Sequence, residues 1–235
     1  MQATEVMAFK LLCNIYMSIP MAVLSPNISL LFTLIFRRVG ENKTTRFCKL
    51  LTHSFCVFIM INGAAVLFEI FGQMDPSGGL MRNFIQQLWG PNAAICAAAD
   101  VTEVNQMIVG GSKLLCEVGS RDQGLFVYLL KAVLPLLQQE GTADAATEIM
   151  LEALLEEGAE NREFDATYSK LAFSQIPEPT SPPEVKMSHS FFANALSSLC
   201  RASPGVFVGM MQSQLSPGEL ATVQTVCSQA GQSLI

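Results

Sequence analysis

The sequence predicts an all-α protein, built as a solenoid of about five helical pairs. Helix signals follow one another along the whole chain, and strand signals are nearly absent. About eleven expected helices recur in pairs with a period of roughly 35–45 residues, which is typical of HEAT or armadillo repeats. Half of the 235 residues are hydrophobic and only 14% are charged. Because each repeat of a solenoid buries its faces against its neighbours, this composition agrees with a HEAT-repeat (armadillo-like) α-solenoid. Periodicity alone leaves other all-α bundles open.

The first two helices are bounded by prolines and glycine. Residues 4–18 are amphipathic, and the helix is expected to end before Pro20. Pro26, between Ser and Asn, is typical of a turn or a helix start. We therefore predict a second helix over about 27–39, ended by Gly40.

The next segment predicts a long helix followed by a short one. The third helix is expected from about residue 42 to residue 63, with a further turn or two up to residue 71. Residues 75–79 (DPSGG) predict a loop. A helix over about 80–89 then follows and is expected to end at the Gly-Pro pair 90–91.

The middle of the chain predicts a helix pair with a short turn, over 99–118 and 122–139. Ser120, followed three residues later by Gln123, is typical of a capping box at the start of the second member. Pro135 is expected to kink that member. The glycines at 110–111 lie within the first member and lack the preceding strand of a phosphate-binding loop, so we interpret them as a close helix–helix contact.

The last third of the chain predicts a helix from Asp144 to about residue 157, an exposed proline-rich loop over 175–186, and then more helices. The closing helices are expected over 187–202, over 205–214 and from 217 onward. Ser216, Pro217 and Glu219 occupy the N-cap, N1 and N3 positions of the last one.

Two uncharged stretches raise the alternative of a membrane protein. Residues 11–36 and 50–68 each reach the length of about 20 residues that a spanning helix needs. The first is interrupted by Pro20 and Pro26, and the second contains polar residues at 52–54. We therefore favour buried helices of a solenoid without membrane insertion, and a small multi-spanning membrane protein is the less favoured alternative.

Charge is distributed unevenly along the chain, whose net charge is −6. This balance argues against a nucleic-acid-binding protein, because affinity for phosphates needs an excess of Lys and Arg. We define the basic cluster by its five members, Arg37, Arg38, Lys43, Arg46 and Lys49. We expect these residues to form one ridge where a helix ends and the next begins.

An acidic segment over 140–165 contains nine acidic residues and the single basic residue Arg162. Glu148, Glu152 and Glu156 are four residues apart, so they lie on one face of the expected helix without a Lys partner. Such a face is either simply solvated or serves a basic partner.

No pattern in the sequence indicates catalysis, a cofactor or a metal. The chain lacks a phosphate loop, a nucleophile elbow and zinc-ligand spacing. Its seven cysteines are scattered without a C-x-x-C pair, which favours free thiols in a reducing compartment. We therefore expect a binding scaffold rather than an enzyme, with no cofactor.

Four blocks of sequence, at residues 30–51, 63–71, 109–117 and 168–173, resemble the importin-α re-exporter family (CAS, or exportin-2), of the importin-β superfamily. Residues 30–51 (LLFTLIFRRVGENKTTRFCKLL) resemble a family segment in which an apolar helix with a basic end is followed by N-S-K-T-T-K-F. Residues 63–71, 109–117 and 168–173 resemble its G-A-L-A-L-Q-E-I-F, V-G-I-T-K-L-L-T-E and F-S-Q-L-A-F blocks, in the same order. The resemblance spans nearly the whole chain and falls at the carboxyl end of the family's proteins.

The resemblance implies a superhelix of HEAT repeats that shuttles through the nuclear pore and carries importin-α from the nucleus to the cytoplasm with Ran-GTP. Residues 1–235 would be the carboxyl-terminal part of such a receptor. The family's principal Ran-binding repeats lie at its amino end, so Ran-GTP is expected to bind through the full-length receptor. The basic cluster and the acidic segment are the expected contact surfaces. A generic HEAT-repeat scaffold in a cytosolic assembly is the alternative.

Overall fold

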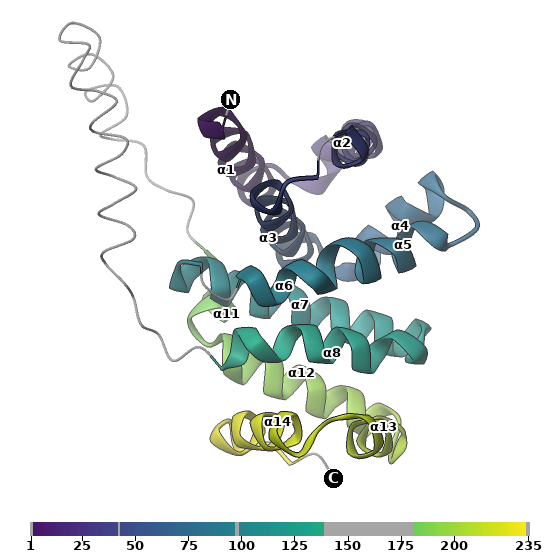
Figure 1. Ribbon diagram of the computed structural model, residues 1–235, viewed down its shortest axis with the longest axis vertical. Coiled ribbons are helices and arrows are strands. Elements are labelled where there is room, and N and C mark those ends of the chain that lie inside the picture. Colours follow the sequence, from purple (N-terminus) through teal and green to yellow (C-terminus); the bar gives the residue numbers. More distant parts are fainter. Residues whose placement is uncertain (1, 42, 97–98, 139–180, 234–235) are drawn as a thin grey trace, which may run out of the picture. The chain divides into compact units, whose positions relative to one another are not determined.

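Every regular element in the described part of the chain is a helix, as the sequence predicts (Figure 1). The computed structural model describes residues 2–41, 43–96, 99–138 and 181–233. These residues belong to one compact unit. Their all-α architecture is consistent with an α-solenoid, whereas the number of repeats and their HEAT type stay predictions. The acidic segment and the helix expected after Asp144 lie outside the described residues.

The helices have the following bounds, in chain order: α1 Gln2–Ser18, α2 Met21–Glu41, α3 Thr45–Asn62, α4 Ala64–Met74, α5 Gly79–Asn83, the π-helix η1 Phe84–Trp89, α6 Gly90–Cys96, α7 Val101–Arg121, α8 Gln123–Leu137, α11 Pro183–Lys186, α12 Ser188–Ala202, α13 Val206–Gln214 and α14 Pro217–Gln229.

Helices α1, α3, α7 and α12 pack one against the next in a single row. The α1–α3 contact includes two edge-to-face aromatic pairs, with ring centroids 5.3 Å apart for Phe9 and Phe47 and 5.1 Å apart for Tyr16 and Phe58. The paired residue numbers rise together, so the two helices run in the same direction. The residue numbers of the contacts between α3 and α7 also rise together, from His53–Gln106 to Met60–Lys113, so these two helices run in the same direction as well.

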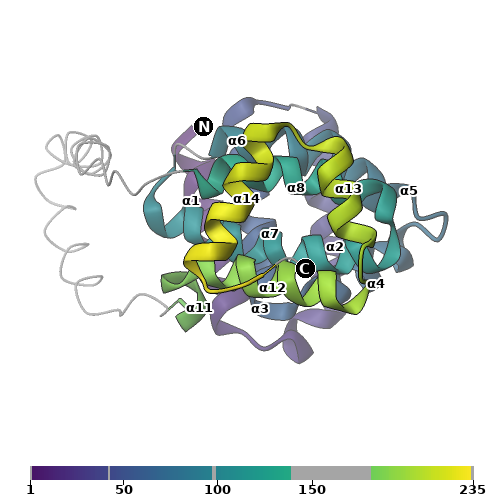
Figure 2. The ribbon, with the colours of Figure 1, turned by 90° about the horizontal axis from the view of Figure 1, so that it is seen from below.

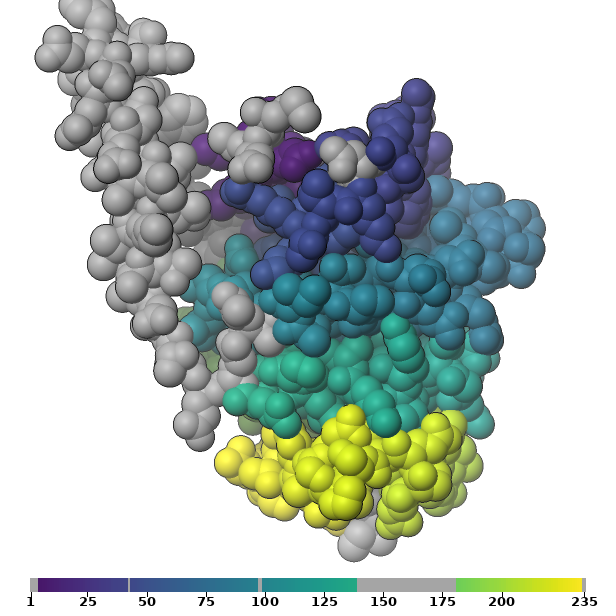
Figure 3. All heavy atoms as spheres, viewed as in Figure 1, coloured from purple at the N-terminus to yellow at the C-terminus, as the bar shows by residue number. Residues whose placement is uncertain are grey.

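A second row is formed by α6, α8 and α14, with α8 antiparallel to its chain neighbour α7. Seen from below in Figure 2, α13 and α14 form the last layer, with α8 and α12 behind them. The space-filling view shows the layers as successive colour bands, because helices close in sequence pack side by side (Figure 3).

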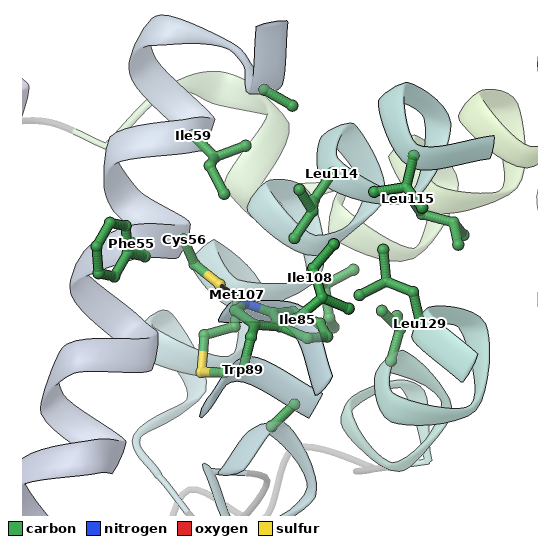
Figure 4. Close-up of a cluster of buried hydrophobic side chains, with 14 of the residues drawn as sticks. Phe55, Cys56, Ile59, Ile85, Trp89, Met107, Ile108, Leu114, Leu115 and Leu129 are labelled. Carbon is green, nitrogen blue, oxygen red and sulfur yellow. Dashed lines mark hydrogen bonds between the residues drawn. The ribbon is translucent and has the colours of Figure 1, made fainter. Parts of the chain in front are cut away.

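The core between the rows is apolar, and Trp89 lies at its centre, fully buried (Figure 4). The indole Nε1 of Trp89 donates to Cys56 Sγ over 3.2 Å. Gly110 of α7 lies directly against the backbone of Cys56, since a Cβ atom added there would be 2.8 Å from Cys56 Cα. At Gly111 an added Cβ would lie 3.2 Å from the Trp89 ring. The prediction that these glycines mark a close helix–helix contact is therefore confirmed.

Helix α2 begins six residues earlier than the sequence predicts, and Pro26 lies inside it. The proline ring removes the N–H that would bond to the carbonyl of Ala22. Both residues are exposed, so water can bond to that carbonyl instead. The turn expected around Pro26 is therefore wrong.

The helical path also continues through Gly90-Pro91, where an end was expected. A π-helix precedes this pair, and the Gly90 N–H bonds to the carbonyl of Ile85, five residues earlier. In this geometry the chain stays helical although Pro91 has no N–H to donate.

Two predicted helix starts have different outcomes. Ser120 remains inside α7 and donates to the carbonyl of Glu117, so it does not cap α8. Asp122 is the N-cap of α8 instead, and its side chain accepts the Gly124 N–H over 3.1 Å. The predicted capping box of Ser216 and Glu219 is confirmed in both directions.

The described end of the proline-rich loop is not exposed coil. Residues 183–186 form the single-turn helix α11, which the sequence did not predict, and Val185 is buried. Pro183 occupies the first helical position, where a missing N–H has no cost. Residues 175–180 of this loop lie outside the described residues.

One helix in the described ranges, α2, is long and apolar enough to cross a membrane by length and composition. Helices α3 and α4 together meet the same criterion, but they are bent by 114° at Gly63. Many residues of α3 lie in the core, whereas only 11% of the apolar window of α2 is buried.

Candidate interaction surface at the α2–α3 connection

The basic cluster spans the end of α2 and the beginning of α3. Arg37 and Arg38 lie in the last turns of α2, and Arg46 and Lys49 lie in the first turns of α3. Thr44 is the N-cap of α3, and its hydroxyl accepts the Phe47 N–H over 3.2 Å. Local capping therefore fixes where α3 begins and sets the position of its basic side chains.

Arg38 joins three helices. Its guanidinium donates to Glu5 Oε1 of α1 over 2.8 Å. The Arg38 side chain exposes 32% of its surface and the Glu5 side chain 25%, so both are largely buried. The guanidinium also lies over the Phe47 ring, 5.4 Å from its centroid. Arg38 thus holds α1, α2 and α3 together, and its charge is compensated within the chain.

Arg37 makes a different kind of ion pair. Its Nε donates to Glu41 Oε1 over 3.1 Å, one turn further along α2. Both side chains are largely exposed, so the pair contributes only about 0.3–0.5 kcal/mol. A partner's carboxylate could therefore compete for Arg37 at small cost.

Lys43 has a structural role that the sequence did not reveal. Its Nζ donates to the carbonyl of Gln87 over 2.9 Å. Gln87 lies in the π-helix η1, so this bond ties the start of α3 to η1.

A second side chain donates to a neighbouring carbonyl of η1. Because the Gly90 N–H bonds to the carbonyl of Ile85, the carbonyl of Gln86 lacks its usual helical partner. Tyr128 of α8 donates its hydroxyl to this carbonyl over 3.0 Å. The Tyr128 ring lies where a side chain at Gly90 would be, since an added Cβ would be 2.6 Å from the ring. Only glycine allows this approach.

Arg46 and Lys49 are the members of the basic cluster most able to bind a partner. Arg46 is exposed and Lys49 is half-buried. Among the described residues, no carboxylate lies within 4.0 Å of either side-chain cation. The five residues predicted as one contact ridge therefore have different roles. Arg38 and Lys43 bind groups within the chain, and Arg37 is weakly paired. Arg46 and Lys49 remain as the two cations without a carboxylate partner among the described residues.

Sequence reasoning missed Glu5, Gln87 and Tyr128, three long-range partners in this region. Each lies more than 30 residues along the chain from the group it binds. No local pattern connects such pairs, although Pro91 within a helical stretch was a signal that nearby carbonyls need other donors. The predicted contact residues Glu148, Glu152 and Glu156 lie outside the described residues.

The described thiols are buried or half-buried, and the described imidazoles are hydrogen-bonded. In ranges 2–41, 43–96, 99–138 and 181–233, no group of three His, Cys, Asp or Glu side chains could hold a metal ion. Burial raises the pKa of the Cys56 thiol and of the Cys96 thiol to about 12, so both are protonated at neutral pH. His53 Nε2 bonds to Gln106 Oε1 over 2.8 Å, and His189 Nε2 bonds to the carbonyl of Leu137 over 3.2 Å.

A groove of about 610 Å³ lies between α13 and α14, away from the basic cluster. Its apolar lining includes Val208, Met211 and Leu220, and its polar lining includes Gln212 and Gln224. None of its lining side chains carries a formal charge.

Comparison with known families gives one match. The family model described as CAS/CSE protein, C-terminus, matches residues 1–226 of the chain. No significant match was found among curated proteins or among solved structures.

Proposed function

Because the chain belongs to the CAS/CSE protein family, we propose that it forms part of a nuclear export receptor that returns importin-α to the cytoplasm in complex with Ran-GTP. Family membership itself indicates an exportin-type transport role and general shuttling between nucleus and cytoplasm. The observation that carries the proposal is the family match over residues 1–226. The finer assignment of importin-α as cargo rests on the four sequence blocks, among them residues 30–51.

The mechanism we propose is thermodynamic linkage between two ligands. If importin-α and Ran-GTP each bind better to the same conformation of the receptor, each raises the affinity of the other. Hydrolysis of GTP on Ran then removes this coupling and releases the cargo. Two rows of stacked helices suit such a role, because small movements between neighbouring layers add up along a stack.

Within this region, Arg46 and Lys49 are the proposed contacts to acidic residues of importin-α, with Arg37 beside them. Arg38 and Lys43 position the surface through their bonds to Glu5 and Gln87. Glu148, Glu152 and Glu156 form a second proposed contact surface for basic groups. Ran-GTP is proposed to bind through other parts of the full receptor.

The test is the affinity of the full-length receptor for importin-α, measured with and without Ran-GTP. The double variant Arg46→Glu/Lys49→Glu should bind importin-α more weakly in the presence of Ran-GTP. The loss should lie mainly in the association rate and should be larger at low salt. Lys186→Glu is the matched control, because Lys186 is exposed on α11, away from the cluster.

Two results would contradict the proposal at different levels. Unchanged affinity of the double variant at low ionic strength would remove the basic cluster from the contact surface and leave the transport role intact. Absence of any Ran-GTP-dependent binding to importin-α would instead favour a generic helical scaffold.

A further inference from the structure

Four serines of the chain are followed directly by proline, which is the minimal substrate pattern of proline-directed protein kinases. They are Ser25, Ser181, Ser203 and Ser216. Proline suits the cleft of such a kinase because it has no backbone N–H that would be buried there without a partner. The kinase also needs a free serine hydroxyl on a stretch of chain that is exposed and not helical. These conditions separate the four serines.

Three of the four serines do not meet these conditions. Ser25 lies inside α2, with helix on both sides of it. The Ser181 hydroxyl accepts a hydrogen bond from Gln106 Nε2 over 3.1 Å. The Ser216 hydroxyl is part of the capping box of α14, where it accepts the Glu219 N–H over 3.3 Å and donates to the Glu219 carboxylate over 2.8 Å.

Ser203 meets the conditions, because it lies in the turn between α12 and α13. Its φ of −138° and ψ of 76° are outside the helical region, as expected for a residue before proline. Its bonds are made by the backbone, from its N–H to the carbonyl of Leu199 and from the Val206 N–H to its own carbonyl, each over 3.3 Å. Ser203 is itself half-buried, but the residues on both sides of it are exposed: Arg201, Ala202, Pro204, Gly205 and Val206.

The helix that follows this turn is held by few contacts. Phe207 and Met211 are the buried residues of α13, and the helix begins at Gly205 without a side-chain cap. Gly209, in the middle of α13, lowers its intrinsic helix stability further. Segments with few buried apolar contacts open locally at low cost in free energy. The turn at Ser203 can therefore extend into a kinase cleft while the rest of the stack stays folded.

Arg201, two residues before Ser203, supplies a cation that a phosphate group would find nearby. It lies in the last turn of α12, and its Nη2 donates to Gln232 Oε1 over 2.9 Å. The Gln232 amide is neutral, so this bond does not compensate the charge of the arginine. Within the described ranges, no carboxylate lies within 4.0 Å of the Arg201 guanidinium. A phosphate would be a much stronger acceptor than the amide oxygen.

We propose that Ser203 is phosphorylated by a proline-directed protein kinase, and that Arg201 then pairs with the phosphate instead of with Gln232. In the reaction the Ser203 hydroxyl oxygen bonds to the γ-phosphorus of ATP, and the bond between that phosphorus and the bridging oxygen breaks. ADP leaves with the electron pair, and the serine proton passes to the base of the kinase. This inference is independent of the transport role.

The two helix ends at this turn act on the phosphate in opposite directions. The carboxyl end of α12 disfavours negative charge, and the uncapped amino end of α13 favours it. Each helix end corresponds to about half a unit charge, so the full charge of Arg201 decides the balance. Its cost is the bond to Gln232, which is one of the residues that line the groove between α13 and α14. Phosphorylation is therefore expected to alter the rim of that groove.

The first experiment is incubation of the full chain with a purified proline-directed protein kinase and ATP, followed by mass spectrometry of its peptides. We expect phosphate on Ser203 and loss of that phosphate in Ser203→Ala. Ser216→Ala is the matched control, because Ser216 is exposed and also precedes proline, and it should be phosphorylated to the same extent as the parent chain. A synthetic peptide of residues 197–209 shows whether the kinase accepts the sequence itself.

A second experiment tests the pairing with Arg201, by a ³¹P NMR titration of the chain phosphorylated to completion. A paired arginine favours the phosphate dianion, so the second pKa of the phosphate should lie below its ordinary value of about 6. In Arg201→Gln this pKa should return towards about 6. Arg121→Gln is the matched control, since Arg121 is also in the last turn of a helix but pairs with Glu117 over 2.6 Å, and it should leave the lowered pKa unchanged.

Three results would overturn the proposal. Phosphate on the peptide but not on Ser203 of the folded chain would mean that the turn is closed to kinases. Refusal of both the peptide and the chain would mean that the sequence around Ser203 is not a substrate. A phosphate pKa that is the same in the parent chain and in Arg201→Gln would mean that this arginine does not pair with the phosphate.

Discussion

The contact between Gly110 of α7 and the backbone of Cys56 of α3 allows a sharp test of how these two helices pack. The change Gly110→Ala adds a single methyl group. Its carbon would lie 2.8 Å from Cys56 Cα, 2.9 Å from the Cys56 carbonyl carbon, and closer still to the carbonyl oxygen. Ordinary contacts between carbon atoms are about 3.5–4.0 Å. The two helices must therefore separate by roughly 1 Å, because backbone cannot rotate away as a side chain can.

Two effects of opposite sign set the size of the change in the free energy of unfolding. Replacing glycine by alanine inside a helix favours folding by up to about 1 kcal/mol. Overpacking a well-packed core costs about 1–3 kcal/mol or more, and displacement of α3 would also loosen the contacts around Trp89. We expect a net loss of about 2 kcal/mol, which corresponds to a fall in Tm of roughly 4–8 °C for a chain of this size.

The assay is thermal unfolding followed by circular dichroism, with Gly72→Ala as the control. Gly72 lies in α4, and an added Cβ meets nothing within 4 Å. The control should therefore show only the favourable helix-propensity effect and melt slightly higher than the parent chain. If Gly110→Ala were as stable as Gly72→Ala, α3 and α7 would not be in backbone contact, and the packing argument would be wrong.

Two further predictions concern a tertiary tie and a helix start. Lys43→Met should lower the free energy of unfolding by about 1 kcal/mol, because the carbonyl of Gln87 loses its side-chain donor. Chemical denaturation measures this loss, and the control Lys186→Met, on exposed α11, should have no effect. The Ser216 backbone N–H and hydroxyl donate to the Glu219 carboxylate and lower its pKa. This carboxylate therefore stabilises the fold at pH values above its ordinary pKa of 4.5, and the stabilisation is lost as the pH falls through the lowered pKa. Ser216→Ala should therefore cost about 1 kcal/mol at neutral pH and less at low pH; an equal loss at both would contradict the capping box.

Helix starts that depend on neighbouring residues could be predicted from the sequence. Ser216 and Glu219 form their capping box within four residues, and both bonds are present. The paired glycines at 110–111 also indicated a close helix contact, although the sequence could not show that Cys56 lies opposite. The family was identified by ordered blocks such as residues 30–51, and the match over 1–226 confirms it.

Other features were decided only by tertiary structure. The helix continues through Gly90-Pro91 by way of a π-helix. Tyr128 and Lys43 donate to carbonyls of that π-helix from far along the chain, and no local pattern announces these bonds. The same limit applies to the basic cluster, where burial against Glu5 makes Arg38 a tie between helices rather than an open contact.

By itself, then, the sequence determined the all-α class, most helix starts and the family, because hydrophobic periodicity, capping residues and motif blocks act over a few neighbouring positions. Which cations are already compensated and which carbonyls accept a side-chain donor depended on groups brought together by folding. Those contacts join residues more than 30 positions apart, so only the packed helices decide them.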